Sequence, residues 1–163
     1  CTGRLPFADH SVKWIFTEHF IEHVPVEGAI SFFKEAYRLL ERGGTLRLST
    51  PDLAIYAAAY FDPNKRFFKE HYDILTENTP LMAEWMTLRR AHMVNQIFRG
   101  FGHQYIYDFD ELGFVAGLGG FTKENGCSIT RASYRGGLLK EIAERDAAVH
   151  RDESVYVELT CMQ

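Results

Sequence analysis

Apolar residues run almost without a break from Val12 to Phe16, and this β-branched and aromatic segment predicts a buried strand of a parallel sheet. From Val26 to Arg42 they recur at helical spacing, which predicts a helix that ends at Gly43-Gly44 in a left-handed C-cap. Thr45 to Thr50 predicts a second strand. A strand, a helix and a strand with short joints form a βαβ unit, so we expect a right-handed crossover here.

The pattern from about residue 53 to 102 is helical but interrupted by prolines, which indicates a helical insertion. After it, Asp108 and Glu111 have the spacing of an N-cap residue and its N3 partner. We therefore expect a short helix that begins at Asp108 and ends at Gly119-Gly120.

Two further strands are expected near the end of the chain, from Ser128 to Tyr134 and from Ser154 to Thr160, with a helix over Leu138 to Arg145 between them. The chain shows no internal repeat and no low-complexity linker. The sequence therefore predicts one α/β domain over residues 1–163, which contains the helical insertion.

Composition narrows the class of protein. The 163 residues include 18 Lys and Arg against 22 Asp and Glu, a net charge of −4, which argues against a nucleic-acid partner because such proteins usually carry a clustered basic face. The longest uncharged apolar stretch, Leu53 to Phe61, is far shorter than the roughly 20 residues of a membrane span, so no membrane partner is expected. Cys1, Cys127 and Cys161 are widely spaced and odd in number, which predicts reduced thiols and a cytoplasmic location.

The sharpest local motif, Thr17 to His23 (TEHFIEH), directly follows the first strand. Because ligands bind at the carboxyl ends of the strands in open α/β sheets, Glu18 and His19 are expected to face a crevice there. For Glu22 the favoured interpretation is a structural acceptor of backbone donors, and for His23 it is packing beneath the helix rather than contact with a ligand.

The chain also contains three longer motifs in a fixed order: LPFADHSVKWIFTEHFIEHV, FFKEAYRLLERGGTLRLSTPDL and GHQYIYDFDELGFVAGLGGF. Together they resemble class I S-adenosylmethionine-dependent methyltransferases of the type 11-like group, over Leu5 to Phe121. The resemblance implies a partial Rossmann-like, doubly wound sheet made of strands four to seven of that fold, with inserted helices. It also implies methyl transfer to a small-molecule, saccharide or lipid acceptor.

The same resemblance implies which residues meet the cofactor, S-adenosylmethionine. Backbone groups around Leu5, Pro6 and Phe7 would flank the adenine ring. The methionine and sulfonium end would be lined by Thr17, Glu18, His19 and Phe20. A positive sulfonium is attracted to an aromatic face or a carboxylate, roles that Phe20 and Glu18 can fill.

Four residues are expected near the acceptor. His19 or His103 could remove a proton from a hydroxyl or amine, since imidazole titrates near neutral pH. Asp52, after the second strand, and Tyr105 are expected to contact the acceptor. For His103 and Tyr105 an ordering role in the loop is an equally good interpretation.

Two features of the family have no counterpart in residues 1–163: the glycine-rich cofactor loop and the acidic residue that binds the ribose hydroxyls. The chain is therefore expected to hold only the C-terminal part of the fold and to bind S-adenosylmethionine weakly or not at all. If the preceding strands are absent, the strand from Val12 to Phe16 has an unpaired edge, which predicts a homodimer.

Two other classes of function stay open at this stage. His19-x-x-Glu22-His23 matches the H-x-x-E-H pattern of inverted zinc proteases, which requires both histidines on one helical face and predicts a zinc-dependent hydrolase. The third class is a non-catalytic, truncated domain that self-associates. The methyltransferase interpretation, with no metal, is the favoured one.

Overall fold

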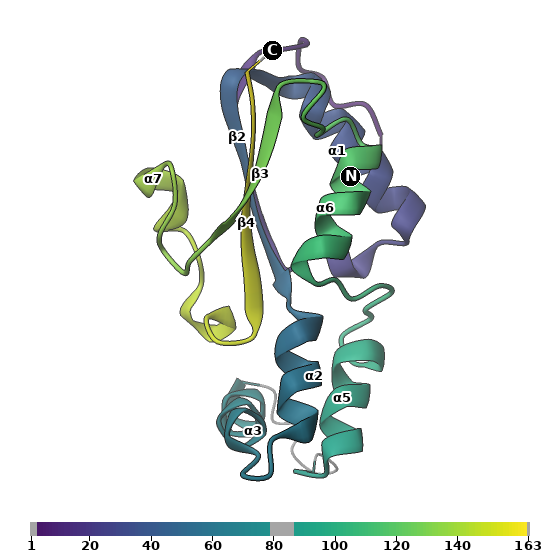
Figure 1. Ribbon diagram of the computed structural model, residues 1–163, viewed down its shortest axis with the longest axis vertical. Helices are drawn as coiled ribbons and strands as arrows, with labels where there is room; N and C mark the ends of the chain where they lie inside the picture. Colours follow the sequence, from purple (N-terminus) through teal and green to yellow (C-terminus); the bar gives the residue numbers. More distant parts are fainter. Residues whose placement is uncertain (1–2, 79–86, 163) are drawn as a thin grey trace.

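The computed structural model describes residues 3–78 and 87–162. A four-stranded sheet, in the order β1-β2-β4-β3, forms one end of the molecule, and a group of helices forms the other (Figure 1). The elements in chain order are β1 (Val12–Glu18), the 3-10 helix η1 (Ile21–His23), α1 (Val26–Leu39), β2 (Leu40–Pro51), α2 (Leu53–Phe61), α3 (Arg66–Asn78), α5 (Arg90–Arg99), α6 (Phe109–Leu118), β3 (Cys127–Ala132), α7 (Lys140–Ala143), the 3-10 helix η2 (Ala148–His150) and β4 (Ser154–Cys161).

The βαβ unit is confirmed. β1 pairs with β2 in parallel, and α1 connects them on the face of the sheet that α6 also covers (Figure 1). Leu46 and Leu48 of β2 are fully buried on this face and join Phe33 of α1 in one hydrophobic cluster. Alternation along β2 thus gives the sheet one apolar face, and α1 and α6 bury it.

The predicted end of α1 is wrong. The helix ends at Leu39, and Leu40 already pairs with Val12 in the sheet. The next pairing, between Trp14 and Thr45, skips four residues of β2, so the chain bulges there, and Gly43 takes a positive φ of 76° within the bulge. Hydrophobic periodicity could not locate this boundary, because Leu40 fits the apolar stripe of a helix and a buried strand equally well.

The burial predicted for the first strand is also wrong. Six of the seven residues of β1 are half-buried and Lys13 is exposed, because β1 lies at the edge of the sheet and, among the described residues, pairs only with β2. Such an edge leaves backbone donors and acceptors available for another strand. The homodimer through this edge stays a prediction.

The last third of the chain follows the predicted pattern closely. The backbone amide of Glu111 donates to the Asp108 side chain at 2.9 Å, which confirms the N-cap, and α6 ends before Gly119 and Gly120. β3 and β4 pair antiparallel, and β4 lies between β2 and β3. The helix expected between them is only four residues long, α7.

The cysteine prediction is wrong for two of the three residues. Cys127 and Cys161 lie directly opposite each other in the β3–β4 register and form a disulfide, whereas Cys1 lies outside the described residues. Their separation of 34 residues hid this, because only the strand register makes them neighbours. The cytoplasmic location stays a prediction, without support from these thiols.

No helix of the described part of the chain is long and apolar enough to cross a lipid bilayer.

The helical part, α2, α3 and α5, has a hydrophobic cluster of its own around Phe68 and Met93 (Figure 1). The residues that flank it meet at the sheet: Asp52 and Tyr107 form a parallel bridge, and the Leu53 amide donates to the Tyr107 carbonyl at 2.8 Å. The chain therefore leaves the sheet and returns to it at one place.

A buried ion cluster lies on the face of the sheet opposite α1. Arg47 of β2 donates from Nε to Asp146 Oδ1 and from Nη1 to Glu158 Oε1, each at 2.9 Å. Its Nη2 donates to the Ser133 carbonyl at 3.0 Å. Because three side chains and two strands meet in this network, it ties the segment around α7 to the sheet.

Candidate functional site

A cavity of about 370 Å³ lies where the carboxyl ends of β1 and β2 meet the helical part. Five of the seven histidines of the chain line it, with one buried glutamate and an apolar wall from α3 and α5. This volume is within the range of small-molecule binding sites. The lining residues are His19, His23, Pro51, Tyr56, His71, Ile74, Leu75, Gln96, Ile97, Phe101, His103, Val149, His150 and Glu153.

His19 occupies a sharp corner directly after β1. Its φ of 45° is left-handed, and its amide donates to the Ser49 carbonyl at 2.9 Å, which holds the corner against β2. The ring stacks on His150 with 3.5 Å between centroids, and Nε2 lies 2.7 Å from Ser154 Oγ. Burial lowers the pKa of His19 to about 3, so the ring is neutral at pH 7 and is a poor proton acceptor.

Glu22 has no solvent exposure and only one of its carboxylate oxygens is bonded. Oε2 accepts a hydrogen bond from Thr50 Oγ1 at 2.9 Å. Oε1 has no hydrogen-bond partner and faces His19 Nδ1 at 3.4 Å and His23 Nε2 at 3.9 Å. Burial raises the pKa of Glu22 to about 7. The carboxylate thus accepts from a side-chain hydroxyl and, as predicted in part, from a backbone donor, its own amide, whose hydrogen bond opposes the effect of burial on the pKa.

His23 and His103 lie next to each other in the cavity wall, with 4.8 Å between ring centroids. His103 Nδ1 is 2.7 Å from the Ile97 carbonyl, which can only accept, so Nδ1 carries the proton and Nε2 keeps its lone pair in the neutral ring. Burial lowers the pKa of His103, which favours this neutral form. The prediction that His23 packs beneath a helix is wrong, because the segment is a single 3-10 turn that directs His23 to the cavity wall.

A second chain of polar contacts crosses the cavity. Tyr56 Oη donates to Glu153 Oε2 at 2.8 Å and therefore accepts from His71 Nε2, also at 2.8 Å. His150 Nδ1 lies 2.9 Å from Glu153 Oε1. Burial alone would lower the pKa of His150, but its hydrogen bond and charge attraction to Glu153 raise it instead. Both carboxylate oxygens of Glu153 are therefore engaged.

Two groups of side chains at the cavity could hold a metal ion: buried Glu22 with the lining residues His23 and His103, and the lining residues His19, His150 and Glu153. In each, the possible ligand atoms lie within 4.8 Å of one another. The two histidines of the H-x-x-E-H pattern fall in different groups. The positive φ of His19 keeps it off any helix, so the arrangement of an inverted zinc protease does not form and the hydrolase interpretation is not favoured.

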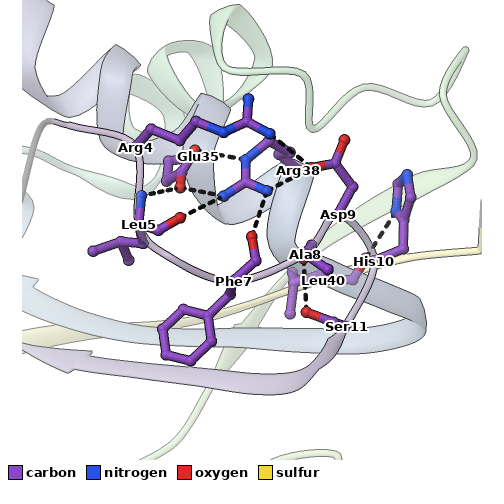
Figure 2. Close-up of polar contacts among 10 residues, drawn as sticks. All are labelled: Arg4, Leu5, Phe7, Ala8, Asp9, His10, Ser11, Glu35, Arg38 and Leu40. Atoms are coloured by element: carbon purple, nitrogen blue, oxygen red, sulfur yellow. Dashed lines mark hydrogen bonds and ion pairs between the residues drawn. The ribbon is translucent and has the colours of Figure 1, made fainter.

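The loop expected at the adenine ring lies beside a second cavity, of about 290 Å³, at the free edge of the sheet. Leu5 and Phe7 line it together with Phe32 of α1. Figure 2 shows how the loop is held: Arg38 donates to the carbonyls of Leu5 and Phe7 at 3.3 and 3.0 Å, and Glu35 Oε1 accepts from the Leu5 amide at 2.7 Å. Pro6 does not line this cavity.

The remaining residues predicted at the cofactor are placed differently. Glu18 Oε1 accepts from the Ala147 amide at 2.8 Å, so this carboxylate is bonded to the segment before η2. Thr17 is half-buried and lines neither cavity. Phe20 packs on Phe32 with 5.5 Å between ring centroids. The turn after β1 thus separates the two cavities, because His19 lines one and Phe20 contacts a residue that lines the other.

Neither predicted acceptor contact lines the histidine cavity. Asp52 is buried, caps α2 by accepting from the Ala54 amide at 3.0 Å, and pairs with Arg131 at 3.3 Å. Tyr105 Oη donates to Glu111 at 2.8 Å. The structure thus gives both residues partners in the scaffold.

Sequence reasoning missed five polar residues of the cavity: Tyr56, His71, Gln96, His150 and Glu153. They come from α2, α3, α5 and the segment before β4, far apart in the sequence, and no local motif contains them. The only available signal was the number of histidines, because seven in 163 residues is a high share for an acidic chain.

Comparison with known proteins agrees with this fold. Residues 2–48 match the family model described as "Methyltransferase domain". The chain is similar to the structure of an SAM-dependent methyltransferase from Thermotoga maritima, described as a possible histamine N-methyltransferase, with 17% identity, a TM-score of 0.50, and coverage of 98% of this chain and 61% of that chain. An SAM-dependent methyltransferase from Archaeoglobus fulgidus gives 13% identity, a TM-score of 0.45, and coverage of 95% and 61%. Curated proteins give no match. The chain spans about three fifths of each of these two structures.

Proposed function

We propose that this chain, a class I methyltransferase by its fold and by the family match of residues 2–48, serves methyl transfer from S-adenosylmethionine to a small molecule in the histidine cavity. One observation carries the proposal: the cavity lies at the carboxyl end of β1, and two residues of its wall, His19 and His23, belong to the matched segment. Open α/β sheets bind their ligands at such strand ends.

The second cavity supplies a place for the adenine ring. Its walls are Leu5, Phe7 and Phe32, which offer apolar surface to a flat heterocycle, and the Arg38 clamp fixes the loop that carries the first two. When bound, S-adenosylmethionine supplies an electrophilic methyl group on a sulfonium. The turn between the cavities would position that end of the cofactor, and such alignment contributes several kcal/mol to displacement reactions.

The acceptor proposed for the histidine cavity is a small molecule with an apolar part and a hydroxyl or amine. Ile74, Leu75 and Ile97 can bury the apolar part. Of the two predicted bases, His103 suits proton transfer better, because its Nε2 lone pair is available, whereas burial keeps His19 neutral and weakly basic.

The test reads the position of bound cofactor rather than its affinity, because weak binding is expected without the glycine-rich loop. S-adenosylhomocysteine is titrated to millimolar excess against the isotope-labelled chain. We expect the amide shifts to change around Leu5 to Phe7 and Thr17 to Phe20. Changes elsewhere only, or none at saturation of the titration, would overturn the proposal.

A pair of phenylalanine variants sharpens this test. Phe7 and Phe114 are both exposed, at 55% and 62%, but only Phe7 lines the second cavity. Phe7→Ala should abolish the shift changes, and Phe114→Ala should leave them as in the parent chain. Equal behaviour of the two variants would remove the adenine site from the proposal.

A further inference from the structure

We propose that buried Glu22, together with His23 and His103 of the histidine cavity wall, forms a binding site for a divalent first-row transition-metal ion. This goes beyond the proposed methyl transfer and does not depend on it, because the ion would bind without cofactor or acceptor. Two imidazoles and one carboxylate are a common ligand set for zinc and related ions.

The ligand atoms are already close together. One atom from each residue lies within 4.8 Å of the other two, and Glu22 Oε1 is 3.9 Å from His23 Nε2. Ligands at about 2.0–2.2 Å from a common zinc ion are separated by about 3–4 Å, so small side-chain rotations suffice to close the site.

The state of Glu22 is the second, independent observation. Its side chain is fully buried, yet Oε1 has no hydrogen-bond partner. A buried carboxylate oxygen without a partner is costly, and such oxygens in native proteins call for an explanation, an unobserved ion among them. A cation bound at Oε1 would complete the coordination of this carboxylate.

The neighbouring contacts orient the ligands as metal sites require. Thr50 donates to Glu22 Oε2, which fixes the carboxylate plane, and His103 donates from Nδ1 to the Ile97 carbonyl, which leaves Nε2 for a metal. Metal-binding histidines usually donate their other ring nitrogen in this way. Gln104 joins the two ligand segments, since its amide donates to the Glu22 carbonyl and its side chain to the His23 carbonyl, each at 2.7 Å.

The other group, His19, His150 and Glu153, is a weaker candidate. Both oxygens of Glu153 are bonded, to His150 and to Tyr56, and His19 Nε2 is bonded to Ser154. An ion would have to break these contacts. This group therefore provides matched controls of the same residue types in the same cavity.

Three protein ligands leave coordination positions open, and the cavity is where a small molecule could fill them. An ion held here would bind a hydroxyl or amine of that molecule directly and lower its pKa. With the ion bound, the His103 Nε2 lone pair would coordinate the metal and could no longer accept a proton. The metal, in place of His103, would then promote loss of the proton from the hydroxyl or amine.

The test titrates Zn²⁺ and Co²⁺ into the chelator-treated chain without cofactor. We expect one tight equivalent per chain by calorimetry and a visible Co²⁺ absorption band. Nitrogen-15 spectra of the imidazole rings should show His23 and His103 changing on Zn²⁺ addition. Absence of binding tighter than millimolar, or changes confined to other rings, would overturn the proposal.

Variants locate the ion. Glu22→Gln and His103→Gln should each lower the Zn²⁺ affinity by at least about a hundredfold, the upper end of what loss of a supporting contact costs, and Thr50→Val by about tenfold. His150→Gln should leave the affinity within about twofold, because it lies outside the site. The reverse pattern would assign the ion to the other group and refute this site.

Circular dichroism verifies folding, and the ring spectra of the parent chain decide the question if a variant unfolds. Cofactor binding is read separately from the amides of Leu5 to Phe7, so failure of either proposal is visible on its own.

Discussion

Two of the buried clusters of titratable side chains in the described part of the chain differ in one respect. Around Arg47, two carboxylates and two backbone carbonyls accept from one guanidinium, and the cluster closes on itself. Around Glu22, three histidine rings lie near one carboxylate, but one oxygen has no donor. A closed network stabilises a particular packing, whereas an open one costs stability and leaves a group available to a ligand.

The position of each cluster agrees with this distinction. Arg47 lies on the sheet face opposite α1 and connects β2 to β4 and to the segment after α7. Glu22 lies at the carboxyl end of β1, beside a cavity. We infer that the first cluster serves the fold and that the second serves binding.

The largest expected effect is loss of the Arg47 guanidinium. Arg47→Met leaves Asp146 and Glu158 buried without their cation, which should lower the free energy of unfolding by roughly 3–5 kcal/mol. Urea unfolding measures this. Arg151→Met, at an exposed pair, is the control and should change stability by less than about 1 kcal/mol. Equal losses in the two variants would contradict the structural role of the Arg47 cluster.

Opening the disulfide should have the next largest effect. Cys127 and Cys161 join β3 to β4, the strand that carries Glu158, across a separation of 34 residues. Reduction should lower the free energy of unfolding by about 2–4 kcal/mol. Unfolding with and without reductant measures the loss, and a Cys127→Ala, Cys161→Ala double variant should show no reductant effect. Stability independent of reductant in the parent chain would mean that the two thiols are not joined.

Glu22→Gln should change stability far less than Arg47→Met. The amide can still accept from Thr50 and can donate toward the histidines, so the expected change is within about 1 kcal/mol in the metal-free chain. A loss as large as that of Arg47→Met, by the same urea measurement, would show that both clusters are structural and would remove the distinction between them.

The smallest effect is local and concerns the half-buried Arg38 clamp in Figure 2. The Arg38 guanidinium and the Leu5 amide hold the pKa of Glu35 at about 2, below its ordinary value. The Glu35 carboxylate therefore stays charged and bonded to the loop down to a pH of about 2, and the bond is lost as the pH falls through that value. The amide shift of Leu5 should therefore titrate with a midpoint near 2. In Glu35→Gln this titration should disappear. A midpoint near 4.5 would mean that the clamp is not formed in solution.

Much of the fold could be predicted from the sequence, because its signals are local. The βαβ unit follows from the periods of its apolar residues, and the Asp108–Glu111 cap follows from spacing alone. The end of α1 could not be predicted in this way, because Leu40 belongs to β2 only through its pairing with Val12, which is not visible in the local sequence. The disulfide was hidden for the same reason: it depends on the register of β3 and β4.

The site could be predicted only where it follows a strand. His19 was found because open α/β sheets bind ligands at the carboxyl ends of their strands, and His103 because of a family motif. His71 and His150 come from α3 and from the segment before β4, and only tertiary packing brings them to one cavity. The role predicted for Glu18 took no account of the Ala147 amide, which lies 129 residues further along the chain.

The bridge between Asp52 and Tyr107 has a consequence for how this protein can vary. Because both ends of the helical part are fixed to each other at the sheet, the intervening residues can be exchanged or resized while the strands keep their register. The exchangeable residues supply Tyr56, His71 and the apolar wall of the cavity, whereas Glu22 and His23 stay with the sheet. A chimaera that replaces residues 53–106 with the corresponding segment of a protein of the same fold should therefore bind a different small molecule in this cavity on an unchanged scaffold.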